Sequence, residues 1–196
     1  MLQADLYALR DYSCEIEILK KHKTTVREQI IRTFEHHLKL LELHDKLNVK
    51  SQPVPVIQGW NIEDYLYCTD IYRDHGIIMD YMAIGTLCRR GMTKTIRKII
   101  LTIKNELPTW VKIHAFGVKI KVLGNKAVWN STYSFDTSSW SLDGRWSSLI
   151  NGRKRFESEL ESCKKFLKKF NLLRQKIHKQ KQLLHFMSTF SNHHNF

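Results

Sequence analysis

Polar segments that follow apolar, strand-like stretches are the feature that most constrains the fold of this chain. The polar segments are residues 11–15, 58–60, 85–90 and 134–137. Apolar stretches at residues 54–57, 77–84 and 133–135 lead directly into the last three. Because the carboxyl ends of parallel strands meet at one edge of a sheet, this arrangement predicts a parallel α/β fold with a site at that edge.

Length and charge limit the class of protein. The 196 residues suffice for one domain with a sizeable core, but they fall short of the roughly 250 residues of a closed eight-unit barrel. Lys and Arg number 32 against 19 Asp and Glu, giving a formal net charge of +13. This excess favours a polyanionic partner such as nucleic acid, and a basic protein without such a partner is the alternative.

The cysteines argue against a zinc site or a disulfide framework. Cys14, Cys68, Cys88 and Cys163 are widely spaced and form no C-x-x-C pair, which fits a reducing compartment. The sequence has no secretory signal and no apolar run near 18 residues, so we expect a soluble, cytoplasmic protein without a membrane partner. No metal and no cofactor is expected.

Local signals in the first half predict alternating helices and strands. Thr25 and Glu28 have the spacing of a capping box, so a helix should begin there. Its apolar face is predicted to be Ile30, Ile31, Phe34, Leu38 and Leu41, with His36, His37, Lys39 and Glu42 on the other faces. Prolines at 53 and 55 favour a short strand ending at Gln58, and Asn61 is a plausible cap for the next helix.

The second half repeats this plan. A strand over residues 77–84 is expected to precede a helix with Ile96, Ile99, Ile100, Ile103 and Leu107 on one face. A strand over residues 110–114, a turn over 114–119 and a short strand after Ala127 should follow. This plan gives about five βα units, three fewer than the eight of a closed barrel. We predict a partial barrel over residues 1–150 and a basic helical tail over residues 151–196.

The tail, one long helix or a helical hairpin, has one apolar stripe and many cations. Helical spacing is kept by the apolar residues Phe156, Leu160, Cys163, Leu167, Phe170 and Ile177. Residues 151–196 contain eleven Lys or Arg and only three Glu. The stripe should dock the helix. Its basic face either follows phosphates or is a solvated surface.

Five motifs occur in order: Asp-Tyr-x-Cys-Glu at residue 11, Pro-Val-Ile-Gln-Gly-Trp at 55, Ile-Gly-x-x-Cys-Arg-Arg at 84, His-x-Phe-Gly-Val-Lys at 114, and Ser-x-Asp-x-x-x-Trp-Ser at 134 with Arg145 beyond. Together they resemble the transglycosylase superfamily that exchanges guanine for a 7-deazaguanine. The chain is most similar to the bacterial and phage branch that acts on DNA, which is related to the tRNA-guanine (queuine) transglycosylases. The resemblance spans about residues 5–145 and leaves out the basic tail.

The resemblance implies a (β/α)8 barrel and a base exchange that leaves the phosphate backbone intact. Such an exchange needs a nucleophile that holds the sugar carbon between two inversions, and Asp136 matches the nucleophile of the family. A lone aspartate there would otherwise be read as a turn or helix cap. The lack of a cysteine-rich zinc motif favours the DNA branch over the tRNA branch.

Base recognition is expected from groups that fit the edge of guanine. By similarity, Asp11 accepts from the N1 and N2 donors, while the Gln58 amide and the Gly85 backbone N–H donate to O6. His114 and Gly117 match a family segment beside the base, although His114 could equally be a structural histidine. Candidate nucleic-acid contacts are Arg89, Arg90, Lys119 and Arg145. Both Arg89 and Arg90 could instead pair with surface carboxylates.

One family segment is missing. The chain has no Asp-Ser-Gly-Gly-Phe-like stretch, which in the family lies upstream and supplies a second catalytic aspartate. We therefore expect another chain, self-association or an upstream piece to complete the barrel. Three functions remain open: guanine exchange in DNA with a 7-deazaguanine base as substrate, the same exchange in tRNA, and a non-catalytic nucleic-acid-binding or assembly subunit that kept the fold. A degenerate gene remnant is a further alternative.

Overall fold

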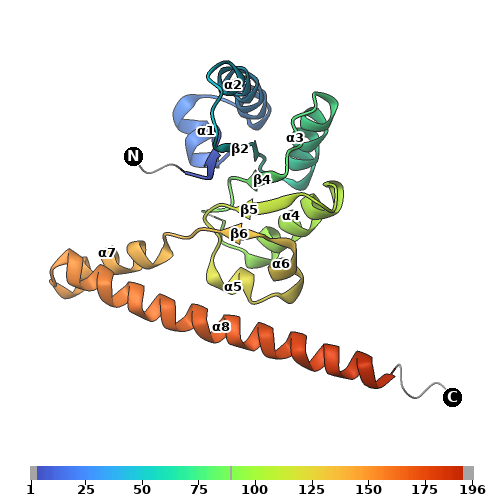
Figure 1. Ribbon diagram of the computed structural model, residues 1–196. Coiled ribbons are helices and arrows are strands. Elements are labelled where there is room, and N and C mark those ends of the chain that lie inside the picture. The colour runs from blue at the N-terminus through green and yellow to red at the C-terminus, as the bar shows by residue number, and fades with distance from the viewer. Residues whose placement is uncertain (1–3, 89, 192–196) are drawn as a thin grey trace. The chain divides into compact units, whose positions relative to one another are not determined.

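The computed structural model describes residues 4–88 and 90–191, with side chains up to residue 178 (Figure 1). It divides into two compact units, Met1–Thr137 and Ser138–Phe196. The first unit carries the strands and the first six helices, and the second consists of the last two helices. The fold is therefore α/β, as predicted from the alternation of apolar and polar segments. Among the described residues, no helix combines the length and the apolar character needed to cross a membrane.

All strands of the first unit are parallel and follow their order in the chain. The strands are β1 (Leu6–Ala8), β2 (Gln52–Val54), β3 (Val56–Ile57), β4 (Tyr81–Ile84), β5 (Lys112–Ala115) and β6 (Ser134–Phe135). One sheet pairs β1 with β2, and the other runs β3-β4-β5-β6. Only Pro55 separates β2 from β3, because proline has no N–H to donate to a ladder. This sequential order is the one found in βα barrels rather than in doubly wound sheets; closure into part of a barrel stays a prediction.

Helices connect β1 to β2 and each successive pair of strands from β3 to β6. In the first unit they are α1 (Ile16–His22), α2 (Val26–Lys46), α3 (Ile62–Asp74), α4 (Thr93–Glu106), α5 (Ile120–Leu123) and α6 (Lys126–Ser131). The capping box predicted at the start of α2 is confirmed, with Thr25 and Glu28 making both reciprocal bonds. Asn61 caps α3 as predicted. Gly76 follows that helix with φ +68°, a conformation that glycine adopts without steric cost.

The two faces of the sheet differ in burial. Ile57, Met82, Ile84, Ile113 and Ala115 point to the helices and are at most 1% exposed. The predicted apolar face of α4 is confirmed, since its four isoleucines are all fully buried. On the opposite face Val54, Val56 and Ala83 form a smaller cluster, against which Tyr81 and Phe116 are only partly buried. Side chains alternate between the two faces along a strand. Gln58 and Asp136, which directly follow β3 and β6, therefore fall on the same face as Val56 and Ala83.

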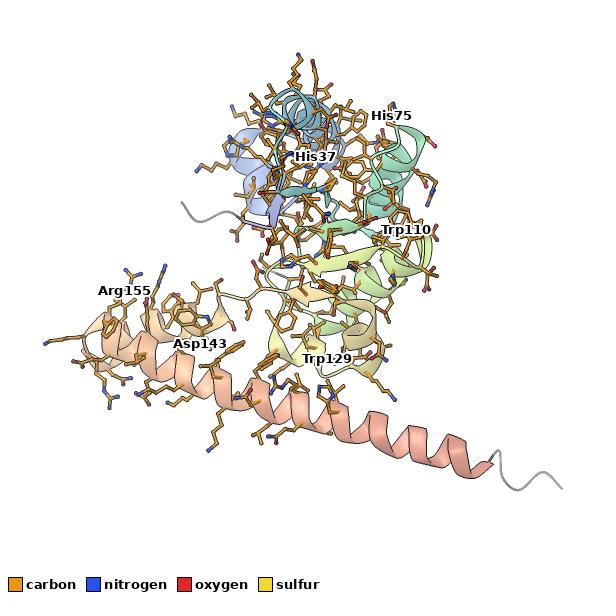
Figure 2. The ribbon with its side chains drawn as sticks, in the orientation of Figure 1. His37, His75, Trp110, Trp129, Asp143 and Arg155 are labelled. Carbon is orange, nitrogen blue, oxygen red and sulfur yellow. The ribbon has the colours of Figure 1, made fainter. Side chains whose placement is uncertain are left out.

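Some predicted elements are wrong in their details. His37 (Figure 2) was expected on an outer face of α2 but is fully buried. Leu38 of the predicted apolar face is 40% exposed. The Tyr72 hydroxyl compensates the buried ring by bonding to Nδ1 of His37 at 2.8 Å. The strand expected over residues 77–84 begins only at Tyr81. Residues 126–131 form the unpredicted helix α6, in which the Asn125 side chain accepts the Val128 N–H. The short strand predicted between Ala127 and Asp136 is confirmed as β6.

The second unit is a helical hairpin of α7 (Ser139–Asn151) and α8 (Arg155–Ser191). Sequence analysis predicted a long helix here but not α7. Gly152 joins the two helices with φ +63°. A Cβ on Gly144 would lie 2.5 Å from the Cα of Glu159, so the absence of a side chain allows the close crossing of the helices.

Candidate functional site

The carboxyl ends of β3, β4, β5 and β6 form one continuous edge. The main-chain ladder extends one residue past each strand, with bonds from Gly85 to Ile57 (3.0 Å), from Phe116 to Ile84 (3.1 Å) and from Asp136 to Ala115 (3.3 Å). Leu9 likewise extends β1 by donating to Val54 at 3.0 Å. The structure therefore aligns the strand ends that precede the predicted site residues.

Three of the predicted base-binding residues lie in direct contact. The Gln58 amide nitrogen donates to Oδ2 of Asp11, although the two residues are 47 positions apart. A Cβ added to Gly85 would overlap the Gln58 amide and would lie 3.1 Å from Oδ2 of Asp11. The absent side chain of Gly85 therefore makes room for the hydrogen-bonded pair. The close approach at Gly85 is therefore that of the Gln58 amide rather than of a ligand. The Gly85 N–H, which sequence analysis expected to bind the base, instead donates to the Ile57 carbonyl at 3.0 Å.

Thr86 fixes the orientation of the Gln58 amide, and sequence analysis missed this residue. Its hydroxyl donates to Oε1 of Gln58 and accepts the backbone N–H of Cys14 at 3.0 Å. With Oε1 held by a donor, the amide nitrogen points to Asp11. Thr86 has φ +54°, which is uncommon for a residue with a branched Cβ. A positive φ leaves no signature in a single sequence, so only the tertiary structure identifies Thr86.

Burial changes the acidity of Asp11. Desolvation raises the pKa of the Asp11 carboxyl above its usual value, and hydrogen bonds from its own backbone and from Gln58 oppose this shift. The carboxylate form is the acceptor that could hold two adjacent donors of a ligand. Ionisation of this group is thus opposed by burial and assisted by Gln58.

Arg90 organises the loops around this cluster. It is 7% exposed. Its guanidinium donates to carbonyl oxygens of Thr86 at 2.8 Å and Trp60 at 2.7 Å. The same group lies 3.2 Å from the Tyr65 hydroxyl, which itself donates to the Gly85 carbonyl at 2.8 Å. Arg90 therefore ties the loop after β3 to the loop after β4, and a phosphate contact of this residue stays a prediction. Arg89 lies outside the described residues.

Asp136 lies at the end of β6 in more open surroundings. Its carboxylate accepts the backbone N–H of Gly117, and its carbonyl oxygen accepts from Val118 at 3.0 Å. The residue itself is exposed. Two strand spacings of about 4.8 Å separate β6 from β4, so roughly 10 Å lies between the backbone at Asp136 and that at Gly85. A ligand that used both ends of the site would have to bridge this gap.

The loop that contains Gly117 connects the two ends. Gly117 has φ +65°, and a Cβ there would overlap the Sγ atom of Cys88. Lys119 donates from Nζ to the Arg90 carbonyl at 2.9 Å, so it joins the loops after β4 and β5. Partial burial, and then the charges of Glu15 and Asp136, raise the pKa of the Cys88 thiol. The thiol is therefore protonated near neutral pH.

His114 points from β5 to the partly exposed face of the sheet. Its Nδ1 atom lies 2.8 Å from the Ser134 hydroxyl, and its ring packs edge-on against Phe116 with centroids 4.5 Å apart. Desolvation lowers the pKa of His114, and the charge of Asp136 partly opposes this effect. A cavity of about 200 Å³ lies beside these residues and is lined by β1, β2, β4, β5 and β6. His114 is therefore a neutral, hydrogen-bonded residue next to a small hollow.

Arg145 belongs to the second unit. It lies on α7 and pairs with Glu159 of α8 at 3.2 Å, and Arg155 contacts the same carboxylate at 2.8 Å. Both arginines are exposed, so these pairs add little to stability. A role of Arg145 in binding nucleic acid stays a prediction. Within residues 4–88 and 90–191, no group of three or more His, Cys, Asp and Glu side chains is arranged to hold a metal ion.

The parallel sheet and the polar strand ends define an α/β protein with a candidate site at the carboxyl edge. The chain belongs to the DpdA family, described as DeoxyPurine in DNA protein A, which matches residues 2–193. This membership connects the chain with deazapurine modification of DNA and makes DNA the implied substrate. It agrees with the resemblance to the DNA branch in the sequence. No curated protein matches the chain.

Proposed function

We propose that this protein exchanges guanine in DNA for a 7-deazaguanine base, with Asp136 as the covalent nucleophile. The observation that carries the proposal is the contact of Asp11, Gln58 and Gly85 at the same sheet edge as Asp136. Asp11 offers a carboxylate and Gln58 an amide, which match the donors and the acceptor on the Watson–Crick edge of guanine, whereas the Gly85 N–H donates to the Ile57 carbonyl and leaves O6 to the Gln58 amide. Membership of the DpdA family supports DNA as the polymer.

The proposed reaction has two displacements at the sugar carbon C1′. In the first, a carboxylate oxygen of Asp136 forms a bond to C1′ while the C1′–N9 bond breaks, and the departing guanine keeps the electron pair and takes up a proton. In the second, the incoming deazaguanine loses its N9 proton, attacks C1′ and releases Asp136. Two inversions give net retention. The exposure of Asp136 supports this role, because a nucleophile must reach a sugar that enters from solvent.

Recognition by Asp11 requires that the target base leaves the DNA stack. Unstacking costs a few kcal/mol, which contacts in the pocket must offset. Tyr12 follows Asp11 directly, and the Arg32 guanidinium lies 4.0 Å from its ring centroid. The Tyr12 ring also packs edge-on against His36, on the same helix as Arg32, with centroids 5.5 Å apart. Stacking of Tyr12 on an unstacked purine stays a prediction.

The proposal includes a partial (β/α)8 barrel that a partner or a second copy completes. The sequential parallel order of the strands and the half-buried Tyr81 and Phe116 on the inner face support it. The completing chain is also the expected source of the group that protonates the departing guanine. Size-exclusion chromatography with light scattering would show self-association.

Replacement of the nucleophile tests the chemistry. Asp136→Asn should reduce base exchange by at least about 1000-fold, because an amide cannot form the intermediate. The measurement is incorporation of radiolabelled base into DNA, together with a denaturing gel for the protein–DNA adduct, in the presence of any chain needed for activity. Asp143→Asn, on exposed α7, is the matched control and should keep full exchange. Undiminished exchange by the Asp136 variant would remove this residue from the mechanism and refute the proposal.

A further inference from the structure

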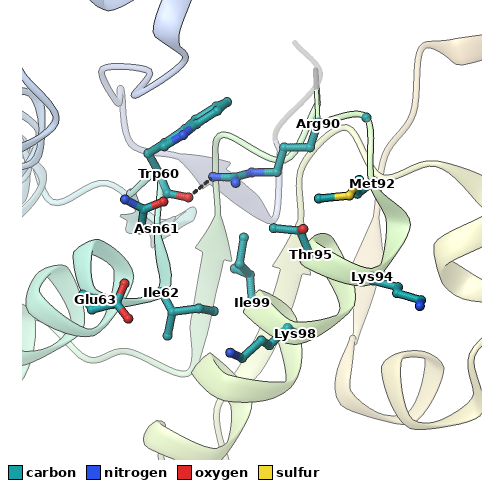
Figure 3. Close-up of a pocket in the computed structure, with 11 residues that line it drawn as sticks. Trp60, Asn61, Ile62, Glu63, Arg90, Met92, Lys94, Thr95, Lys98 and Ile99 are labelled. Atoms are coloured by element: carbon teal, nitrogen blue, oxygen red, sulfur yellow. Dashed lines mark hydrogen bonds between the residues drawn. The ribbon is translucent and has the colours of Figure 1, made fainter.

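A second, larger cavity lies beside the base-binding cluster, between the amino-terminal ends of α3 and α4 (Figure 3). Its volume is about 780 Å³, within the range of small-molecule sites. Both helices begin just after β3 and β4, so the cavity opens at the same edge of the sheet as Asp11 and Gln58. The predicted catalytic and base-binding residues do not line it.

The lining combines an apolar floor, an aromatic wall and a cationic rim. Ile62 and Ile99 lie at the floor, and Trp60 stands on the wall formed by the loop after β3 (Figure 3). Lys94 and Lys98 are one helical turn apart on α4, and both are exposed. Neither lysine forms an ion pair with a carboxylate in the part of the chain that the structure describes.

Arg90 supplies a third cation and connects this cavity to the base-binding cluster. Its guanidinium lines the cavity and lies 4.4 Å from the centroid of the Trp60 ring. The same group holds the carbonyl of Thr86, whose hydroxyl orients Gln58. The wall of the cavity and the guanine-binding amide therefore share one hydrogen-bonded framework.

We propose that this cavity binds a nucleotide that flanks the exchanged guanosine in DNA. Its phosphate would pair with Lys94 and Lys98, and its base would pack against Trp60 above the apolar floor. The inference rests on the proposed function, because the DNA strand must reach the cavity from the base-binding cluster. An aromatic ring next to unpaired cations is the combination that proteins use for unstacked nucleotides. Glu63 is the only carboxylate that lines the cavity within the described residues, so the lining is net positive.

Salt dependence of binding tests the phosphate contact. A Lys94→Ala/Lys98→Ala variant should reduce the slope of log affinity against log salt concentration by about 1, because the loss of one phosphate contact removes about 0.9 from the slope. The probe is a fluorescein-labelled duplex DNA with one target guanosine, titrated with the full chain by fluorescence anisotropy. Lys39→Ala/Lys121→Ala, two exposed lysines on α2 and α5, carries the same charge change outside the cavity. Equal slopes for the two double variants would overturn the proposal.

A missing base tests the aromatic contact. Trp60→Leu, which keeps an apolar side chain, should weaken binding about 10-fold, as expected when one base loses its stacking partner. An abasic residue is then placed in turn at each position within two nucleotides of the target. At one of these positions the wild type should lose the same factor of affinity, and the Trp60→Leu variant should lose no further affinity. If the affinity losses from the abasic residue and from Trp60→Leu add at every position tested, the proposal is overturned. Equal or stronger binding of RNA with the same sequence would assign the cavity to RNA instead.

The two proposals fail in different ways. If Asp136→Asn keeps exchange while the Lys94/Lys98 effect appears, the cavity is a DNA site on a protein with other chemistry. If Asp136→Asn loses exchange while both cavity tests give control values, the exchange stands and the cavity assignment is wrong.

Discussion

The two ends of the same sheet edge are built differently. Beside β3 and β4, Asp11, Gln58 and Thr86 form a hydrogen-bonded chain that is at least half-buried. Beside β6, Asp136 is exposed and is held through the backbone of the Gly117 loop. The contrast is between a cluster fixed by side chains from distant segments and a carboxylate fixed by its neighbouring strand.

The difference suggests a division of work. Groups that distinguish one base from another must have fixed positions before the ligand arrives, because each mobile side chain costs entropy on binding. A nucleophile must remain accessible to a sugar that is part of a long polymer. The rigid end therefore fits recognition, and the open end fits covalent chemistry. Four substitutions or conditions test this division, from the largest expected effect to the smallest.

A methyl group at the rigid end should have the largest effect. Gly85→Ala places a Cβ against the Gln58 amide and near Asp11. We expect guanine affinity to fall at least about 100-fold and the free energy of unfolding to fall by roughly 2–3 kcal/mol, the usual cost of overpacking. Calorimetric binding of free guanine and urea unfolding measure the two. Gly91→Ala, where nothing lies within 4 Å of the added methyl group, is the control for unfolding. Wild-type affinity in Gly85→Ala would contradict a rigid base site.

Removal of the Asp11 charge should separate binding from stability. Asp11→Asn should weaken guanine binding about 10- to 100-fold, because charge-assisted hydrogen bonds are lost. Burial raises the pKa of Asp11, so its stabilising contribution is present at low pH and is lost as pH rises through the folded-state value. The asparagine variant should therefore resist urea better than the wild type at neutral pH. Lower resistance would show that the carboxylate is needed for folding rather than for recognition.

Acid should destabilise the fold through His37 of α2. Burial lowers the pKa of His37 to about 4 from its usual 6.5, so the protonated form favours the unfolded chain. Stability is retained above the unfolded value and declines as pH falls below it. At pH 5 the expected loss is about 2 kcal/mol relative to neutral pH. Urea unfolding across this pH range measures the loss, and His37→Gln should remove that part of the dependence. An unchanged pH profile in this variant would place the sensitive group elsewhere.

The smallest effect is expected at the open end. Gly117→Ala adds the strain of a positive φ, about 1 kcal/mol, and a clash with Cys88. The double variant Gly117→Ala/Cys88→Ala should relieve the clash and retain the strain, as measured by urea unfolding. Free guanine should lose less affinity in both variants than in Gly85→Ala, and unchanged affinity would remove Gly117 from the predicted base-binding residues. A loss of guanine affinity as large as that of Gly85→Ala would show that the two ends are one rigid unit.

Local hydrogen bonding explains which elements the sequence predicted. The capping box at Thr25 and the isoleucine face of α4 depend on residues three or four positions apart, and both are confirmed. Burial of His37 depends on Tyr72, which is 35 positions away, and the periodicity of α2 therefore placed the histidine on the wrong face. For the same reason α7 was missed, since its contact with α8 at Gly144 involves a distant segment.

The sequence by itself determined where strands end in polar residues, which helices are capped, and which motifs point to deazapurine modification of DNA. These features depend on neighbouring residues or on the order of residues along the chain. Only the tertiary structure decided that Thr86 orients Gln58, that Gly85 leaves room for the bond to Asp11, and that Arg90 points inward to carbonyl groups. Those decisions come from packing between segments, because a buried polar group must take its partner from whichever segment lies next to it.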